Sequence, residues 1–356
     1  MRGGSNTIPL LIQSYMKQPL AIISTDWHIK MENRESILSI AKQEIQLAQE
    51  RGVDTVLWLG DVFDSRTSQS QELLTMVDSI LNMYYLAGLT VHCIPGNHDK
   101  TDYGDDKSFL TVFKYHPNFH LHETPDMVDF GSVKFWFMPF YRQDVYLDRF
   151  QMCMPLGRCV LFSHTAIQGS INNDGSKVES PINVSLFKGF EKVFLGHYHN
   201  RQQPAKDIFH LPSVQQNNFG EDEDKGFTVL YDDLSFELVK SVFKPYKEIV
   251  VDARTVTSEE LVELSKSSVD GVNLRLTFTG DQQAVKKIDR KKFTAVGISV
   301  QVKYDDVDVD EVDGQQDIVA MTGTSIAEKF EEFCKEKGYD YVKGYELLKE
   351  VMKWQE

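Results

Sequence analysis

The chain has 356 residues, 41% hydrophobic and 26% charged, which is ordinary for a soluble globular protein. No stretch approaches the roughly 20 apolar residues that a membrane helix needs, so we expect no membrane contact. The net charge of −15 excludes nucleic-acid binding through bulk electrostatics, so a DNA-binding surface would have to be local or helped by metal ions. Four cysteines without a CxxC pair predict a reducing, cytoplasmic compartment.

The first part of the chain alternates short apolar runs with helical patterns. Strands are predicted at 20–25, 54–59 and 90–95, and helices at 35–51 and 70–87. This β-α-β-α-β order predicts a layered α/β domain.

From residue 133 onward the pattern shifts toward strands. Further strands are predicted at 133–138, 159–163, 192–195 and 227–231. We therefore interpret residues 18–244 as one domain with a mixed sheet system and outer helices. The residues before it, 1–17, are interpreted as a tag or leader.

Three segments follow this domain. Residues 245–304 predict a small α+β domain with a basic face, because 271–303 hold seven basic and two acidic residues. Residues 305–323 form an acidic run with few apolar groups, which is typical of a solvated linker. Residues 324–356 predict two short helices whose apolar residues are spaced for an amphipathic face.

Metal-ligand residue types appear where five predicted strands end. They are Asp26, His28, Asp61, Asn97, His98, Asp99, His164, His197 and His199. Loops at one edge of a sheet system gather such residues around a single point. A lone Gly-Asp or a lone histidine is usually structural, but five such signals in order are hard to obtain by chance.

The chemistry of this set is coherent. Carboxylate, imidazole and amide oxygen suit Mn²⁺, Fe²⁺ or Zn²⁺ better than Mg²⁺ or Ca²⁺. One carboxylate, such as Asp61, can bridge two ions roughly 3.5–4 Å apart, and such a pair binds phosphate oxygens and lowers the pKa of a bridging water. The sequence therefore predicts a two-metal phosphodiesterase.

The five blocks resemble the calcineurin-like metallophosphoesterase family over about residues 20–240. The resemblance implies a two-sheet β-sandwich flanked by helices. It implies a first ion held by Asp26, His28, Asp61 and His199. It implies a second ion held by Asp61, Asn97, His164 and His197. In this family the histidine at the position of His98 faces the scissile phosphate and assists the leaving group, and Asp99 would orient it by hydrogen bonding.

A narrower resemblance comes from the regions between the motifs. Segments 164–170, 181–190 and 219–226 are similar to the SbcD nucleases, which work with an SMC-like ATPase in recombination and double-strand-break repair. Two departures stand out. Residues 211–213 read Leu-Pro-Ser where many members have Pro-Gly-Ser, and Asp64 stands where archaeal and eukaryotic members often carry a second histidine.

This narrower resemblance implies a Mn²⁺-dependent DNA exonuclease and endonuclease that acts on double-stranded and single-stranded DNA. The expected cofactor is two Mn²⁺ ions, with Mg²⁺ or another divalent ion as the alternative. Residues 245–304 would be the DNA-capping domain, or an ordinary small domain with a solvated basic face. Residues 324–356 would bind the ATPase, or pack on themselves as a helical hairpin. The short chain suggests a compact or phage-encoded member, which would work in the host cytoplasm.

The resemblance also implies a homodimer. The predicted helix 70–87 carries more apolar residues than one core face requires, and with 109–113 it could form a helical bundle across a two-fold axis. The alternative is a helix that is simply buried.

Two other functions use the same residues. The substrate could be a small phosphodiester or a phosphoprotein instead of DNA. The chain could also be a non-catalytic scaffold on the same fold, although such members lose metal ligands and this sequence has lost none.

Overall fold

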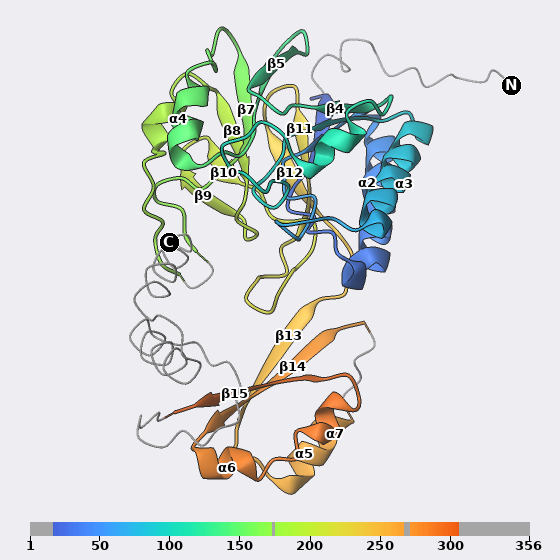
Figure 1. Ribbon diagram of the computed structural model, residues 1–356, viewed down its shortest axis with the longest axis vertical. Helices are drawn as coiled ribbons and strands as arrows, with labels where there is room; N and C mark the ends of the chain where they lie inside the picture. The colour runs from blue at the N-terminus through green and yellow to red at the C-terminus, as the bar shows by residue number, and fades with distance from the viewer. Residues whose placement is uncertain (1–16, 173–174, 267–270, 306–356) are drawn as a thin grey trace, which may run out of the picture. The chain divides into compact units, whose positions relative to one another are not determined.

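The structure, a computed structural model, describes three ranges of the chain: 17–172, 175–266 and 271–305. These described ranges form two six-stranded sheets and a separate three-stranded sheet (Figure 1). The predicted leader lies outside the described residues except for Lys17, and the predicted linker lies outside them except for Asp305. The predicted helices of 324–356 lie outside them entirely. Across the described ranges, no helix combines the length and the hydropathy needed to cross a membrane.

The first sheet has the strand order β12-β11-β1-β2-β3-β4. Strands β1 to β4 run parallel to their neighbours, and β11 is antiparallel to both β1 and β12. The strands are β1 (Pro19–Ser24), β2 (Thr55–Trp58), β3 (Thr90–Cys93), β4 (Phe119–Leu121), β11 (Gly226–Tyr231) and β12 (Phe236–Lys240). The strands predicted in this sheet are confirmed, with ends that shift by at most two residues.

The second sheet has the order β5-β6-β7-β8-β10-β9. Strands β6, β7, β8 and β10 are parallel, and the edge strands β5 and β9 are antiparallel to their neighbours. The strands are β5 (Asp126–Asp129), β6 (Lys134–Met138), β7 (Cys159–His164), β8 (Lys192–Gly196), β9 (Gln202–Ala205) and β10 (Ile208–His210). The three strands predicted here, β6 to β8, are confirmed.

Local sequence signals mark one end of each of the two long helices in this part of the chain. The helices here are α2 (Arg34–Arg51), α3 (Gln71–Leu86), α4 (Gln143–Phe150) and the short 3-10 helices η1 (Met31–Asn33), η2 (Phe109–Phe113) and η3 (Val184–Phe187). Helix α2 ends at Gly52, whose φ of 68° is a left-handed conformation that glycine adopts without strain. Helix α3 begins after Ser70, whose hydroxyl accepts a hydrogen bond from the Leu73 amide.

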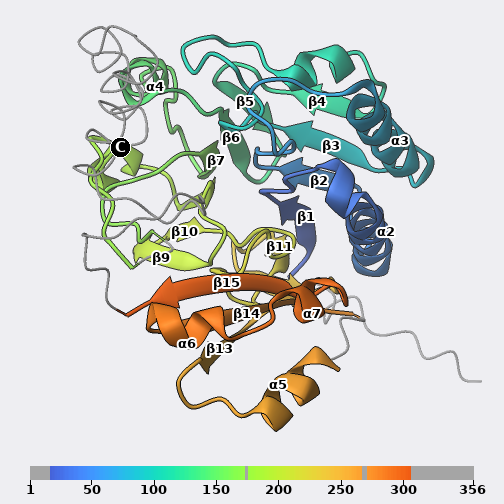
Figure 2. The same cartoon turned by 60° about the horizontal axis from the view of Figure 1, so that its bottom comes forward.

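Alternate side chains of β1 enter two different cores. Ile22 belongs to a core shared with Ile40 of α2 and Ile80 of α3. Its neighbour Ile23 points the other way, into a core that contains Phe162 of β7. A third core lies between the far face of the second sheet and α4. The order is therefore helix, sheet, sheet, helix (Figures 1 and 2), which confirms the predicted sandwich flanked by helices.

The apolar side chains along one face of α3 pack into the chain's own core. The buried residues of this face are Leu73, Val77, Ile80, Leu81 and Tyr84. Leu74 packs against the same core, and Leu110 and Phe113 of η2 are buried as well. These side chains therefore give no support to a dimer surface, because the alternative of a buried helix accounts for them.

Residues 246–304 form the third sheet, with β14 between β13 and β15 and all three strands parallel. The elements are β13 (Tyr246–Asp252), α5 (Ser258–Ser265), β14 (Asn273–Gly280), α6 (Gln282–Lys286), α7 (Lys291–Thr294) and β15 (Ser299–Tyr304). Leu276 and Phe278 of β14 pack with Ile288 and Phe293 in a core of their own. We call this segment the small domain.

Candidate metal centre

The metal-ligand residue types lie where the parallel strands end. Asp26 and Asp61 follow β1 and β2, and Asn97 follows β3. In the second sheet, His164 is the last residue of β7 and His197 follows β8. Because the carboxyl ends of parallel neighbours meet at one edge of a sheet, these loops converge.

Four of the residues in these loops have a backbone that non-glycine residues rarely adopt. The φ angles are 54° at Asp26, 46° at His28, 51° at Asp61 and 94° at His197. Left-handed backbone at such residues costs on the order of 1–3 kcal/mol each and clusters at functional sites. No sequence pattern indicated these conformations.

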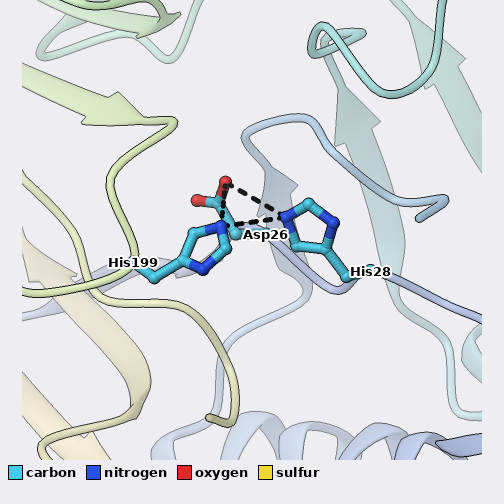
Figure 3. A group of neighbouring side chains, drawn as sticks. All are labelled: Asp26, His28 and His199. Atoms are coloured by element: carbon cyan, nitrogen blue, oxygen red, sulfur yellow. Dashed lines mark hydrogen bonds and ion pairs between the residues drawn. The ribbon is translucent and has the colours of Figure 1, made fainter. Parts of the chain in front are cut away.

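The first group consists of Asp26, His28 and His199 (Figure 3). The Nε2 atoms of the two histidines lie 3.0 Å apart. Each Nε2 also lies 3.9 Å from Oδ1 of Asp26. The three side chains thus point toward one position, as expected for ligands of one ion.

The second group consists of Asp61, His164 and His197, with Asn97 beside it. Asp61 Oδ2 lies 3.3 Å from His164 Nε2. The Asn97 amide oxygen lies 3.2 Å from the same nitrogen and 2.9 Å from His197 Nδ1. Asp61 Oδ2 also lies 3.7 Å from His28 Nε2 of the first group. Asp61 therefore stands between the two groups.

These two groups fit two divalent cations that share Asp61. Imidazole nitrogens, carboxylate oxygens and an amide oxygen converge, and this donor set suits Mn²⁺, Fe²⁺ or Zn²⁺. All seven predicted metal ligands lie in or beside the two groups. When bound, two such ions neutralise phosphate oxygens and make water a stronger nucleophile.

The charges of the second group shift one another's pKa values. Burial alone would raise the pKa of Asp61, but the charge and hydrogen bond of His164 and the charge of His28 hold it well below its usual range. Burial would lower the pKa of His164, yet the charge and hydrogen bond of Asp61 raise it to about 9. Burial and the charge of His164 hold the pKa of His197 well below its usual range. A histidine binds a metal ion only in its neutral form, so protonation of His164 competes with metal binding and acid weakens that binding.

Two ligand histidines are oriented by partners on their far ring nitrogens. His199 Nδ1 lies 2.7 Å from Oε1 of buried Glu221, and His164 Nδ1 lies 2.7 Å from the Leu59 carbonyl oxygen. Lys225, also buried, donates from Nζ to the His199 carbonyl oxygen at 2.7 Å. Such partners fix which nitrogen faces the metal. Through Glu221 and Lys225, segment 219–226 positions His199, a role that its sequence alone did not reveal.

His98 lies next to both groups. Its backbone amide donates to Asp61 Oδ1 at 2.8 Å, and its ring stands edge-on to His28 with centroids 4.6 Å apart. Its Nδ1 donates to the Asp64 carbonyl oxygen at 2.5 Å. Arg66 donates to its Nε2 from Nη2 at 2.7 Å and from Nε at 3.1 Å. Both ring nitrogens therefore contact groups outside the two metal groups.

The prediction that Asp99 orients His98 by hydrogen bonding was wrong. Asp99 does not orient the ring, because its carboxylate accepts hydrogen bonds from the backbone amides of Phe63 at 3.0 Å and Gly96 at 2.9 Å. The Asp64 carbonyl takes the orienting role. Burial and the charge of Asp61 raise the pKa of Asp99 to about 7. Asp99 therefore joins the two loops that carry Asp61 and His98 and has no direct contact with the His98 ring.

The family sequence profile described as "Calcineurin-like phosphoesterase" matches residues 21–201. The chain belongs to this family. It is accordingly a hydrolase of phosphate esters, and the resemblance predicted from the five blocks is confirmed. The match covers β1 to β8 and ends just after His199, so β9 to β12 follow it.

Several known proteins are similar to the chain. "Exonuclease subunit 1" of Enterobacteria phage T4 is 25% identical over 188 residues, 51% of this chain and 55% of the relative. The SbcD protein of the SbcCD nuclease from Staphylococcus saprophyticus is 24% identical over 271 residues, 64% of this chain and 69% of the relative. The chain thus matches little more than half of the phage protein. A solved dimetal phosphatase from Danio rerio aligns at a TM-score of 0.41 with 10% identity, covering 59% of this chain and 91% of that one, a likeness too distant to carry an argument.

Proposed function

We propose that the chain is a Mn²⁺-dependent DNA exonuclease and endonuclease that processes double-strand breaks for recombination and repair. The observation that carries the proposal is the similarity to the SbcD protein of the SbcCD nuclease, which extends over 271 residues and therefore beyond the family match at 21–201. The phage relative, named as an exonuclease subunit, supports the same substrate. The two groups of metal-ligand side chains would, with cations bound, supply the phosphodiester chemistry.

His98 serves the leaving group in this mechanism. A carbonyl oxygen only accepts hydrogen bonds, so the contact with Asp64 places a proton on His98 Nδ1. In the neutral ring Nε2 is then the acceptor and carries no proton, so the ring can donate from Nε2 to the leaving oxygen only after Nε2 has taken up a proton from water. Asp26, Asp61 and the ligand histidines would hold two cations, which would neutralise charge on the scissile phosphate.

The small domain supports DNA as the substrate through its basic face. The exposed basic residues of the α6–α7 segment are Lys286, Lys287, Arg290, Lys291 and Lys292. The apolar residues between them, Val285, Ile288 and Phe293, are buried. A local positive face of this kind can contact phosphates even though the whole chain carries a charge of −15.

The test combines two substrates and one variant. Protein loaded with Mn²⁺ is incubated with linear double-stranded and single-stranded DNA, and separately with bis(p-nitrophenyl) phosphate. We expect cleavage of DNA, and a loss of about 100- to 10,000-fold in His98→Ala with metal content and DNA binding retained. His120→Ala, an exposed histidine of β4, is the matched control and should cleave like the wild type.

Three results would contradict the proposal. Activity on the small diester without activity on DNA would overturn the nuclease assignment. Full DNA cleavage by His98→Ala would remove the role assigned to that ring. A chain that binds no Mn²⁺ at saturation would instead support the scaffold function.

The partner proposed for residues 324–356 is an SMC-like ATPase, because one relative is named as a subunit of SbcCD. The same proposal places the protein in the cytoplasm, or in the host cytoplasm if a phage encodes it. Homodimerisation stays a prediction. Co-purification with the ATPase encoded nearby, with and without residues 318–356, tests the partner: we expect the truncated chain to lose it, and equal recovery of both chains would refute the docking role.

A further inference from the structure

The loop that follows β2 holds both sides of the His98 ring. Asp64 supplies the carbonyl oxygen that accepts from Nδ1, and Arg66, two residues later, supplies the guanidinium that donates to Nε2. The contact at Nε2 uses both Nε and Nη2 of the guanidinium. The N–H donors of the Arg66 guanidinium therefore occupy the position next to Nε2 of His98.

Among the residues that the structure describes, the charge of Arg66 has no carboxylate partner. In the ranges that the structure describes, no Asp or Glu oxygen lies within ion-pair distance of this guanidinium, although several other arginines, such as Arg149 and Arg275, pair with acids. The side chain is exposed, so it contributes nothing to a core. An exposed cation aimed at a neutral imidazole leaves its positive charge free for an anion.

The surroundings make such a cation useful. Asp26, Asp61, Asp64 and Glu221 place four carboxyl groups around the metal centre, and the chain as a whole carries −15. A phosphodiester approaching this region needs local positive charge besides the two cations. Lys30 is already engaged, because its Nζ lies 3.5 Å from Asp64 Oδ1. Among the described residues, Arg66 is the basic side chain that donates hydrogen bonds to the His98 ring.

We propose that Arg66 binds the substrate phosphate in front of His98. When the substrate binds, the guanidinium releases Nε2 of His98 and donates to non-bridging phosphate oxygens instead. Its planar fork of N–H donors can bind two such oxygens at once. The exchange leaves Nε2 facing the leaving oxygen. The inference rests on the proposed phosphodiesterase function and adds a substrate-binding residue to it.

The test measures binding and turnover separately. Mn²⁺-loaded wild type, Arg66→Ala and Arg66→Lys are compared for hydrolysis of bis(p-nitrophenyl) phosphate and for competitive inhibition by inorganic phosphate. We expect Arg66→Ala to weaken phosphate inhibition and to lower kcat/KM by roughly 10- to 100-fold, the loss typical of a charged hydrogen-bond partner. Arg66→Lys keeps the charge but not the fork of N–H donors. Its phosphate inhibition and kcat/KM should therefore lie between those of the wild type and Arg66→Ala.

Chemical rescue separates substrate binding from a structural role. Guanidinium ion at tens of millimolar should restore part of the activity of Arg66→Ala in a saturable manner, and urea should not. Arg158→Ala is the matched control, because Arg158 directly precedes β7 at the end opposite His164, roughly 20 Å away along a strand that rises about 3.3 Å per residue. It should behave like the wild type.

The outcomes distinguish this inference from the proposed function. No wild-type hydrolysis of any phosphodiester would sink the proposed function itself. An active wild type together with an Arg66→Ala variant of unchanged phosphate inhibition and unchanged kcat/KM would overturn the role of Arg66 alone. Faster turnover in Arg66→Ala would overturn it as well, since the guanidinium would then only obstruct His98.

Discussion

A carboxyl group lies fully buried between the first sheet and its helices. Glu44 of α2 accepts hydrogen bonds through Oε2 from the Tyr84 hydroxyl at 2.5 Å and from Trp58 Nε1 at 3.4 Å. Its Oε1 has no hydrogen-bond partner among the described residues. Burial raises the pKa of Glu44 to about 7, against the hydrogen bonds from Tyr84, Ser24 and Trp58, which lower it. We therefore expect Glu44 to make stability depend on pH near neutrality.

The sign and size follow from this pKa. A carboxyl group whose pKa is raised from 4.5 unfolded to about 7 folded binds its proton more tightly in the folded state. Its contribution is fully present below the unfolded pKa and is lost as the pH rises through the folded pKa. The shift corresponds to about 3 kcal/mol at about 1.4 kcal/mol per pKa unit, and most of it is lost between about pH 5 and 8.5.

The assay is urea unfolding of the wild type and Glu44→Gln from pH 5 to pH 8.5 in chelator. Groups common to both proteins cancel in the difference, so the free energy of unfolding should fall by about 2–3 kcal/mol more in the wild type than in the variant. Glu35→Gln, an exposed carboxyl of the same helix, should keep the wild-type pH dependence. If Glu44→Gln and the wild type lose stability in parallel, the reasoning about this buried carboxyl is refuted.

Three further predictions concern the metal centre and the small domain. Glu221→Ala removes the partner of His199 Nδ1 and should weaken Mn²⁺ binding by about 10- to 100-fold in a chelator competition. Gly96→Ala would put a Cβ 2.2 Å from Asp61 Oδ1 and 2.4 Å from the Asp61 backbone nitrogen, so we expect less bound metal by elemental analysis and a lower free energy of unfolding. Phe278→Ala should destabilise the small domain by about 3–5 kcal/mol in hydrogen exchange while metal content stays unchanged.

The sequence predicted the strands and the position of the site because both depend on local signals. An apolar run followed by Asp61 or His164 indicates a strand and the edge where it ends, and parallel pairing brings such edges together. The family resemblance then divided the ligands into two sets, and the structure brings the members of each set close to one another.

Other contacts could not be predicted because they depend on how distant loops meet. Asp99 is adjacent to His98 in sequence, yet its carboxylate is turned to the amides of Phe63 and Gly96. The contact of Glu221 with a ligand histidine joins residues 22 positions apart, and that of Arg66 with His98 joins residues 32 positions apart. No spacing rule links residues across such loops.

The left-handed backbone at Asp26, His28, Asp61 and His197 has a consequence for how this chain can evolve. Each of these positions stores conformational strain that glycine would relieve, so the most readily accepted replacement for folding is also one that deletes a ligand. Selection for stability alone would therefore tend to empty the metal centre. A chain that retains all four side chains in this backbone shows a compromise in which foldability has been limited by the chemistry of the site.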